Sequence, residues 1–182
     1  DRIEAVFGQR LTPLQVVERV LRDVKEKGDV AVRELTLLLD GAELDSLEVP
    51  MGNIQDAYAS VDGQVVEALR TAVERVREFH EAAMSRSWTD SNRGYGQLVS
   101  PVGRVGVYVP GGTASYPSTV VMTSVPAKVA GVEEVVVCTP PAENGYPDPV
   151  VLVASDLAGV DRVFTVGGAQ AIAAMAYGTA TV

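Results

Sequence analysis

Cysteine and histidine are almost absent from this 182-residue chain, which has one of each, Cys138 and His80. A single cysteine excludes an internal disulfide, so a reducing, cytoplasmic setting is the simpler interpretation. A single histidine would have to serve every Ser/His/Asp or Cys/His triad, so none can be assembled. We interpret Cys138 as an inert core thiol and His80 as a structural or surface residue.

An excess of positive charge is also lacking, because 24 acidic residues outnumber 15 Lys and Arg and the formal net charge is -9. Nucleic-acid binding and anionic membrane surfaces both call for clustered Lys and Arg, so we expect neither partner. No uninterrupted apolar run reaches about 18 residues, and no basic-then-apolar signal pattern opens the chain, so we expect no membrane-spanning helix.

Residues 1–100 predict an N-terminal helical region. Thr12, Pro13 and Gln15 form a capping box before a helix that Gly28 ends. Asp29 is predicted to cap the next helix. The remaining predictions here are helices over 29–40, 53–60 and 63–85, a loop over 88–96, and a strand over 97–100.

Residues 101–182 predict alternating strands and helices. The strands are 104–109, 134–139 and 162–166, and the helices are 118–130, 149–158 and 169–177. Strands that are apolar throughout are buried on both faces, which indicates a parallel sheet. The predicted fold is therefore α/β, a Rossmann-like parallel sheet (β-α-β-α-β-α) preceded by the helical region, with a domain boundary near residue 100.

Two glycine-rich turns follow predicted strands, at Pro110-Gly111-Gly112 and at Gly167-Gly168-Ala169-Gln170. Ligands bind beyond the carboxyl ends of parallel strands, and glycines there allow close backbone approach while a helix N-terminus suits a pyrophosphate. A tight strand-to-helix connection is the other interpretation. The G-x-G-x-x-G fingerprint and the P-loop are both absent.

Tyr108 lies at the end of the first of these strands, and its neighbours Val107 and Val109 should point to the opposite face. It can contact a nucleotide, or it can be a core aromatic with a satisfied hydroxyl. Gln170, in the first turn of the last helix, can contact a cofactor amide or ribose, or it can meet the exposed N–H groups of that turn.

Four segments resemble signatures of the histidinol dehydrogenase family, in family order and spacing. They are R-V-G-V-Y-V-P-G-G (104–112), Y-P-S-T-V-V-M (116–122), P-A-K-V-A-G-V (126–132) and V-G-G-A-Q-A-I-A-A (166–174). The N-terminal helices are similar more loosely, through Lys27-Gly28-Asp29 and Phe79-His80. The resemblance covers nearly the whole chain.

The resemblance implies NAD-dependent oxidation of L-histidinol to L-histidine through L-histidinal, the last steps of histidine biosynthesis, by a homodimer. In that family zinc positions the substrate and a Glu-His pair moves protons. The resemblance also implies that residues 101–182 form the NAD-binding domain, with Tyr108 and Gln170 at the cofactor. The glycine-rich turn after the first strand adds Gly111 and Gly112 as candidate cofactor contacts.

Two departures from the family pattern stand out. Ala83 occupies the glutamine place of a His-x-x-Gln pattern, which weighs against a role for His80. The Gly-Pro-Gly-Asn segment, the zinc ligands and the Glu-His pair have no counterpart before Val182. We therefore expect a fragment that is inactive alone and holds no catalytic or metal-binding residue. The alternatives are a half-length, non-catalytic nucleotide- or partner-binding module, or a doubly wound domain with purely structural glycines.

Overall fold

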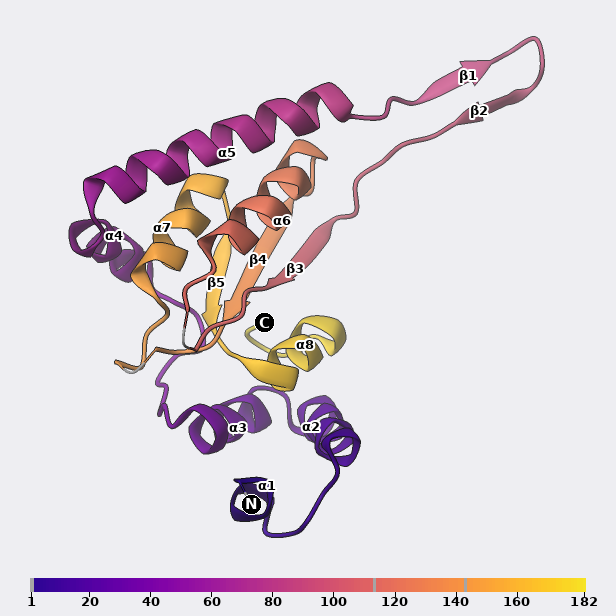
Figure 1. Cartoon of the computed structure of the whole chain (residues 1–182). Coiled ribbons are helices and arrows are strands. Elements are labelled where there is room, and N and C mark those ends of the chain that lie inside the picture. Colours follow the sequence, from indigo (N-terminus) through magenta and orange to yellow (C-terminus); the bar gives the residue numbers. More distant parts are fainter. Residues whose placement is uncertain (1, 113, 143) are drawn as a thin grey trace.

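A three-stranded parallel sheet lies at the centre of the computed structural model, which describes residues 2–112, 114–142 and 144–182. The strands are β3 (Arg104–Tyr108), β4 (Glu134–Thr139) and β5 (Arg162–Thr165), in the order β3-β4-β5 (Figure 1). β4 pairs with β3 through Val137 opposite Val107, and with β5 through Val137 opposite Val163. The predicted α/β fold with a parallel sheet is confirmed.

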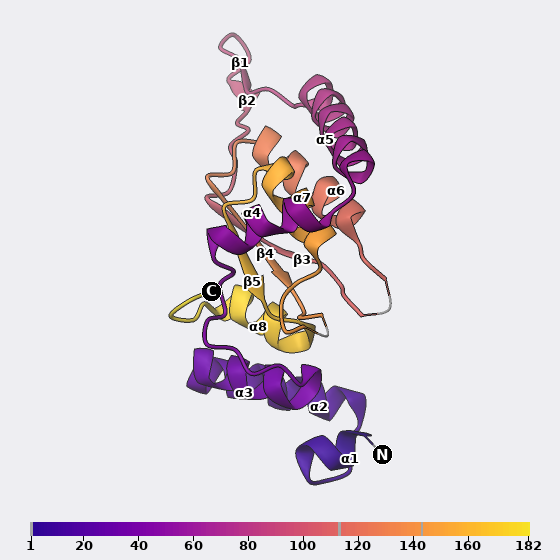
Figure 2. The same cartoon turned by 90° about the vertical axis from the view of Figure 1, so that its left-hand side faces the viewer.

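One face of the sheet is covered by two layers of helices. α6 (Pro117–Val129) and α7 (Pro149–Ala158) lie on the strands, and α4 (Met51–Ser60) and α5 (Gly63–Ala83) pack over them (Figures 1 and 2). Alternate strand residues, such as Val107 and Val137, point into this apolar cluster. Burial of these valines accounts for the β-branched strand sequences, because branched side chains pack well on a pleated surface.

The opposite face is covered by α8 (Gly168–Tyr177), with α2 (Pro13–Lys27) and α3 (Asp29–Asp40) packed beneath it. The capping box of α2 is present as predicted. Asp29 is not the cap of α3: Gly28 is, at φ +56°, and the Asp29 carboxylate instead accepts a hydrogen bond from Thr181 Oγ1. The short helix α1 (Arg2–Phe7) was not predicted.

The loop predicted over 88–96 is wrong, because this stretch forms an antiparallel hairpin of β1 (Trp88–Asp90) and β2 (Tyr95–Gln97). The strand predicted over 97–100 is accordingly displaced toward the N-terminus. Asp90 Oδ1 accepts from the backbone N–H groups of Asn92 and Arg93, which closes the turn. Figure 1 shows the hairpin projecting from the body of the molecule.

The sheet gains an irregular edge on the β5 side from the segment between α3 and α4. Val49 N donates to Val163 O at 2.8 Å, and Thr165 N donates to Leu47 O at 2.7 Å, around an antiparallel bridge between Glu48 and Phe164. Helices that precede residue 100 thus pack on both sides of the sheet, and the boundary near residue 100 stays a prediction. Over the described ranges, no helix is long and apolar enough to cross a membrane.

Candidate functional site

The carboxyl ends of the three strands form one edge of the sheet, called here the carboxyl rim. β3 continues into Pro110-Gly111-Gly112, β4 into Pro140-Pro141, and β5 into Gly167-Gly168. Because the strands are parallel, these three connections are neighbours in space. The rim therefore brings both of the glycine-rich turns to the same end of the sheet, as predicted.

Pro140 lies wedged between the two turns. A Cβ on Gly111 would lie 2.5 Å from Pro140 Cγ, and a Cβ on Gly167 would lie 2.6 Å from Pro140 Cβ. Both distances are shorter than side chains tolerate, so packing against the proline already requires glycine at these two positions. Contact of Gly111 with a cofactor stays a prediction.

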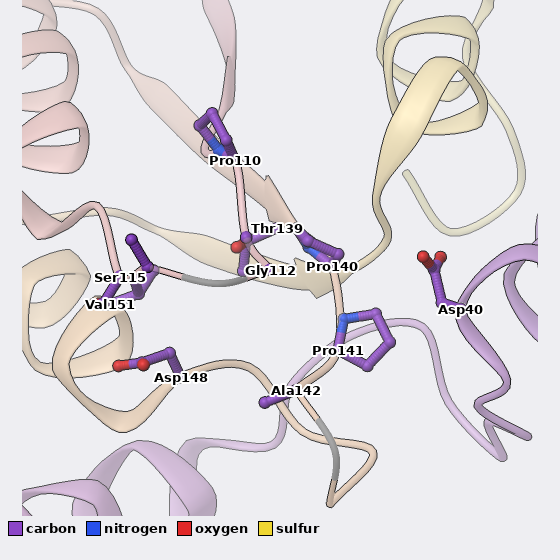
Figure 3. Close-up of a pocket in the computed structure, with 12 residues that line it drawn as sticks. Asp40, Pro110, Gly112, Ser115, Thr139, Pro140, Pro141, Ala142, Asp148 and Val151 are labelled. Atoms are coloured by element: carbon purple, nitrogen blue, oxygen red, sulfur yellow. The ribbon is translucent and has the colours of Figure 1, made fainter.

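Gly112 differs, because it opens onto a cavity of about 530 Å³ between the connections after β3 and β4 (Figure 3). Its φ of +112° is a conformation that other residues rarely adopt, and apart from its chain neighbours no described residue has an atom within 4 Å of a Cβ built on it. The cavity is lined by Asp40, Pro110, Gly111, Gly112, Ala114, Ser115, Thr139, Pro140, Pro141, Ala142, Asp148 and Val151.

The charged groups among these lining residues are two carboxylates, those of Asp40 and Asp148, and no Lys, Arg or His is among them. Asp148 Oδ1 accepts from Val150 N at 2.8 Å and so caps α7. The described lining residues therefore offer no cation to a pyrophosphate. Sequence reasoning missed both aspartates: Asp148 before Pro149 is a helix-start signal, whereas Asp40 carries no signal because it comes from a distant helix.

Tyr108 faces α8, while Val107 and Val109 point into the opposite cluster, as predicted. The half-buried phenol accepts a hydrogen bond from Gly168 N at 3.2 Å. Its own O–H has no acceptor in the described part of the chain. The hydroxyl can therefore still donate to a ligand that approaches the start of α8.

Gln170 is 1% exposed, yet neither its Oε1 nor its Nε2 has a hydrogen-bond partner among the described residues. The amide folds back toward Gly168, where a Cβ would lie 2.7 Å from Oε1. The alternative that this side chain meets the exposed N–H groups of its turn is therefore not what the structure shows. An unpaired buried amide costs about 1–3 kcal/mol, which a ligand could recover.

Tyr108 and Gln170 meet at Gly168, whose N–H donates to the Tyr108 hydroxyl and whose Cα lies beside the Gln170 amide. Gly168 directly follows Gly167, which packs on Pro140, and Pro140 lines the cavity. The cavity and the Tyr108–Gln170 pair are thus adjoining parts of one rim.

Cys138 and His80 were both interpreted as structural residues, and neither lines the cavity. Cys138 is fully buried in β4, and burial raises the pKa of its thiol to about 12, so the thiol stays protonated at neutral pH. His80 lies on α5, with its ring edge-to-face against Phe79 at 5.3 Å. Within the described ranges, no three His, Cys, Asp or Glu side chains converge as metal ligands would.

Comparison with known proteins relates this chain to one enzyme family, through both a family profile and individual relatives. The sequence profile of the family described as histidinol dehydrogenase matches residues 9–182. A histidinol dehydrogenase of Deinococcus radiodurans is 51% identical over 184 residues, covering 100% of this chain and 42% of that protein. One of Geobacter sulfurreducens is 50% identical over 174 residues, covering 92% and 40%.

A solved structure extends this result to three dimensions. The crystal structure of histidinol dehydrogenase from Elizabethkingia anophelis superposes with a TM-score of 0.88 at 32% sequence identity, covering 96% of this chain and 41% of that one. This chain thus spans about 40% of the length of the relatives it matches.

Proposed function

Because the chain belongs to the histidinol dehydrogenase family, we propose that it forms the NAD-binding part of an enzyme that oxidises L-histidinol to L-histidine through L-histidinal. Its place would then be in the last steps of histidine biosynthesis, in the reducing cytoplasm, as part of a homodimer. The zinc ligands and the Glu-His pair that the resemblance implies would be supplied by residues outside these 182.

The unpaired amide of Gln170 is the observation that carries this proposal. The carboxamide of nicotinamide and the edge of adenine each offer a donor beside an acceptor, which is the pattern an amide side chain can pair with. The Tyr108 hydroxyl, with a free O–H next to Gly168, adds a second polar contact at the same place. The donor set therefore fits a dinucleotide.

The residues of this chain would bind and orient the cofactor, and NAD would accept a hydride when bound. Tyr108 and Gln170 would fix one end of the dinucleotide at the start of α8. Gly111 and Gly112 would let the rest lie close to the backbone along the rim. Orientation of this kind contributes to catalysis by holding reacting groups in a productive geometry.

The test is to exchange the Gln170 amide for an apolar side chain of similar size. Gln170→Met should weaken NAD binding about tenfold or more, because two hydrogen bonds to the ligand are lost. The same change should leave the melting temperature unchanged or raise it, since a buried unpaired amide disappears. Isothermal titration with NAD and thermal unfolding of the 182-residue chain measure the two effects.

Gln55→Met, at an exposed position of α4, is the matched control and should change neither quantity. Tyr108→Phe removes only a hydroxyl and should weaken NAD binding by a smaller factor. Unchanged NAD affinity in Gln170→Met, or a large loss of stability with it, would show that the amide serves the fold and not the cofactor.

A further inference from the structure

The cavity beside Gly112 differs in charge from a phosphate site. Its only ionisable side chains among the described lining residues are the carboxylates of Asp40 and Asp148, which come from α3 and from the start of α7. Figure 3 shows the two side chains on opposite sides of the Thr139–Ala142 connection. Any group that enters the cavity is therefore exposed to negative charge from two directions.

The helix starts beside the cavity do little to offset this charge. α7 begins at the cavity, but Asp148 Oδ1 already accepts from Val150 N. α6 begins with Pro117, which has no N–H, and Thr119 N donates to Tyr116 O. A free helix terminus contributes only about half a positive charge, so two carboxylates outweigh the two helix starts.

The polar groups that remain suit hydroxyls. Ser115 and Thr139 supply hydroxyl oxygens to the lining, and the Oδ2 of Asp148 keeps its acceptor capacity after Oδ1 has capped the helix. A ribose with free 2′- and 3′-hydroxyls donates hydrogen bonds to such acceptors. A phosphomonoester carries about -1.5 to -2 charges at neutral pH and would be repelled.

We propose that this cavity holds a ribose of the dinucleotide and that Asp40 and Asp148 select NAD against NADP. The inference rests on the proposed function, because it assumes that a dinucleotide occupies the rim beside Tyr108 and Gln170. The cavity adjoins that pair through Pro140 and Gly167, so one extended ligand can reach both. Asp148 is held in place by its cap, which fixes its carboxylate as a selecting group.

The size of the effect follows from simple electrostatics. A doubly charged phosphate about 6 Å from one carboxylate is disfavoured by roughly tenfold even at the dielectric constant of water, and by more at a protein surface. The wild-type chain should therefore bind NADP at least about tenfold more weakly than NAD. Asp148→Asn should lower the preference for NAD over NADP by about tenfold or more, because the repulsion of the 2′-phosphate is lost and because the Nδ2 that replaces Oδ2 cannot accept from a ribose hydroxyl of NAD.

A matched control separates this local effect from net charge. Asp62 caps α5 as Asp148 caps α7, with Oδ1 accepting from Gln64 N at 2.7 Å, and it does not line the cavity. Asparagine is as good a cap as aspartate, so Asp62→Asn and Asp148→Asn both preserve the helix start and remove one charge. Asp40→Asn tests the second carboxylate and should act in the same direction as Asp148→Asn.

Isothermal titration of each protein with NAD and with NADP, at low and at physiological salt, decides the matter. A lower preference for NAD in Asp148→Asn but not in Asp62→Asn supports the inference. Equal affinity of the wild type for the two nucleotides, or equal effects of Asp148→Asn and Asp62→Asn, overturns it and leaves the proposed function standing. Binding of neither nucleotide overturns both.

Discussion

The two ends of the three parallel strands differ in how their polar side chains are paired. At the amino ends charges are paired: Arg104 with Glu134 at 2.6 Å, Arg162 with Glu48 at 2.6 Å, and Lys128 with Asp161. At the carboxyl ends lie a cavity lined by the carboxylates of Asp40 and Asp148, and the buried amide of Gln170, which has no hydrogen-bond partner among the described residues. Single atoms of Ser124 and Asp29 are also buried and unpaired in the described chain, but Gln170 is the one described side chain in which both polar atoms lack a partner. Such an amide next to a cavity indicates contact with a ligand, because folding alone would favour pairing it.

Steric changes at the carboxyl rim should have the largest effect on stability. Gly167→Ala would place a Cβ 2.6 Å from Pro140 Cβ and 3.3 Å from its Cα, so we expect the free energy of unfolding to fall by about 1–3 kcal/mol. Chemical denaturation measures this loss. Most of it should vanish in the Pro140→Gly background, because glycine lacks the Cβ that the new methyl group would meet, whereas Pro140→Ala keeps that atom and should relieve little of the loss.

Gly63→Ala, at the first position of α5 with open space around it, is the control and should cost nothing. If Gly167→Ala were as harmless as Gly63→Ala, the wedge between the two glycine turns would not be the reason for the glycine.

Charge changes at the amino ends of the strands should have a smaller effect on the free energy of unfolding and should leave NAD affinity unchanged. The hydrogen bonds from Arg162 lower the pKa of Glu48, so the folded state gains stability from this carboxylate above its unfolded pKa. That gain is lost as the pH falls through the lowered pKa. Glu48→Gln should therefore cost about 0.5–1 kcal/mol at pH 7, the amount typical of a partly exposed pair.

Unfolding free energies of wild type and Glu48→Gln should converge as the pH falls toward 3, since both then lack the charge. NAD affinity should be the same in the two proteins at pH 7, and Glu78→Gln on the exposed side of α5 serves as the surface control. A pH-independent gap between the curves would mean that packing, and not the ion pair, is lost in the variant.

Zinc should produce the smallest effect, because neither end of the sheet gathers metal ligands among the described residues. Calorimetric titration of the chain with zinc should show no stoichiometric high-affinity site. One tightly bound zinc per chain would contradict the expectation that the ligands lie outside these 182 residues.

The sequence predicted the elements whose signals are local and strong. The range 134–139 is a run of β-branched residues closed by two prolines, and 149–158 begins with Asp148-Pro149, so both match β4 and α7. The β1–β2 hairpin was missed because its strands are short and exposed and lack apolar alternation. Asp29 was misplaced because Gly28, at positive φ, takes the capping position itself.

The candidate site was predictable only in part. Tyr108 and Gln170 were candidates from their positions at a strand end and a helix start, and the family resemblance favoured the cofactor role. Their meeting at Gly168 depends on how α8 returns over the sheet. Asp40 reaches the cavity from a helix far earlier in the chain. Glycine is required at positions 111 and 167 because Pro140, in the connection after β4, packs against both of them. Such long-range contacts leave no periodic pattern in a single sequence.

The antiparallel bridge at Glu48 leaves only the β3 edge of the described sheet open to a further strand. It occupies the outer backbone groups of β5, while the described chain places no strand beyond β3, so growth of the sheet is possible in one direction only. α8 lies on the opposite face from α6 and α7, and Met175 packs over Gly106 of β3. A right-handed connection leading out of α8 to a parallel strand would therefore reach the open border beside Tyr108, and the crevice between the two strands would open next to the phenol.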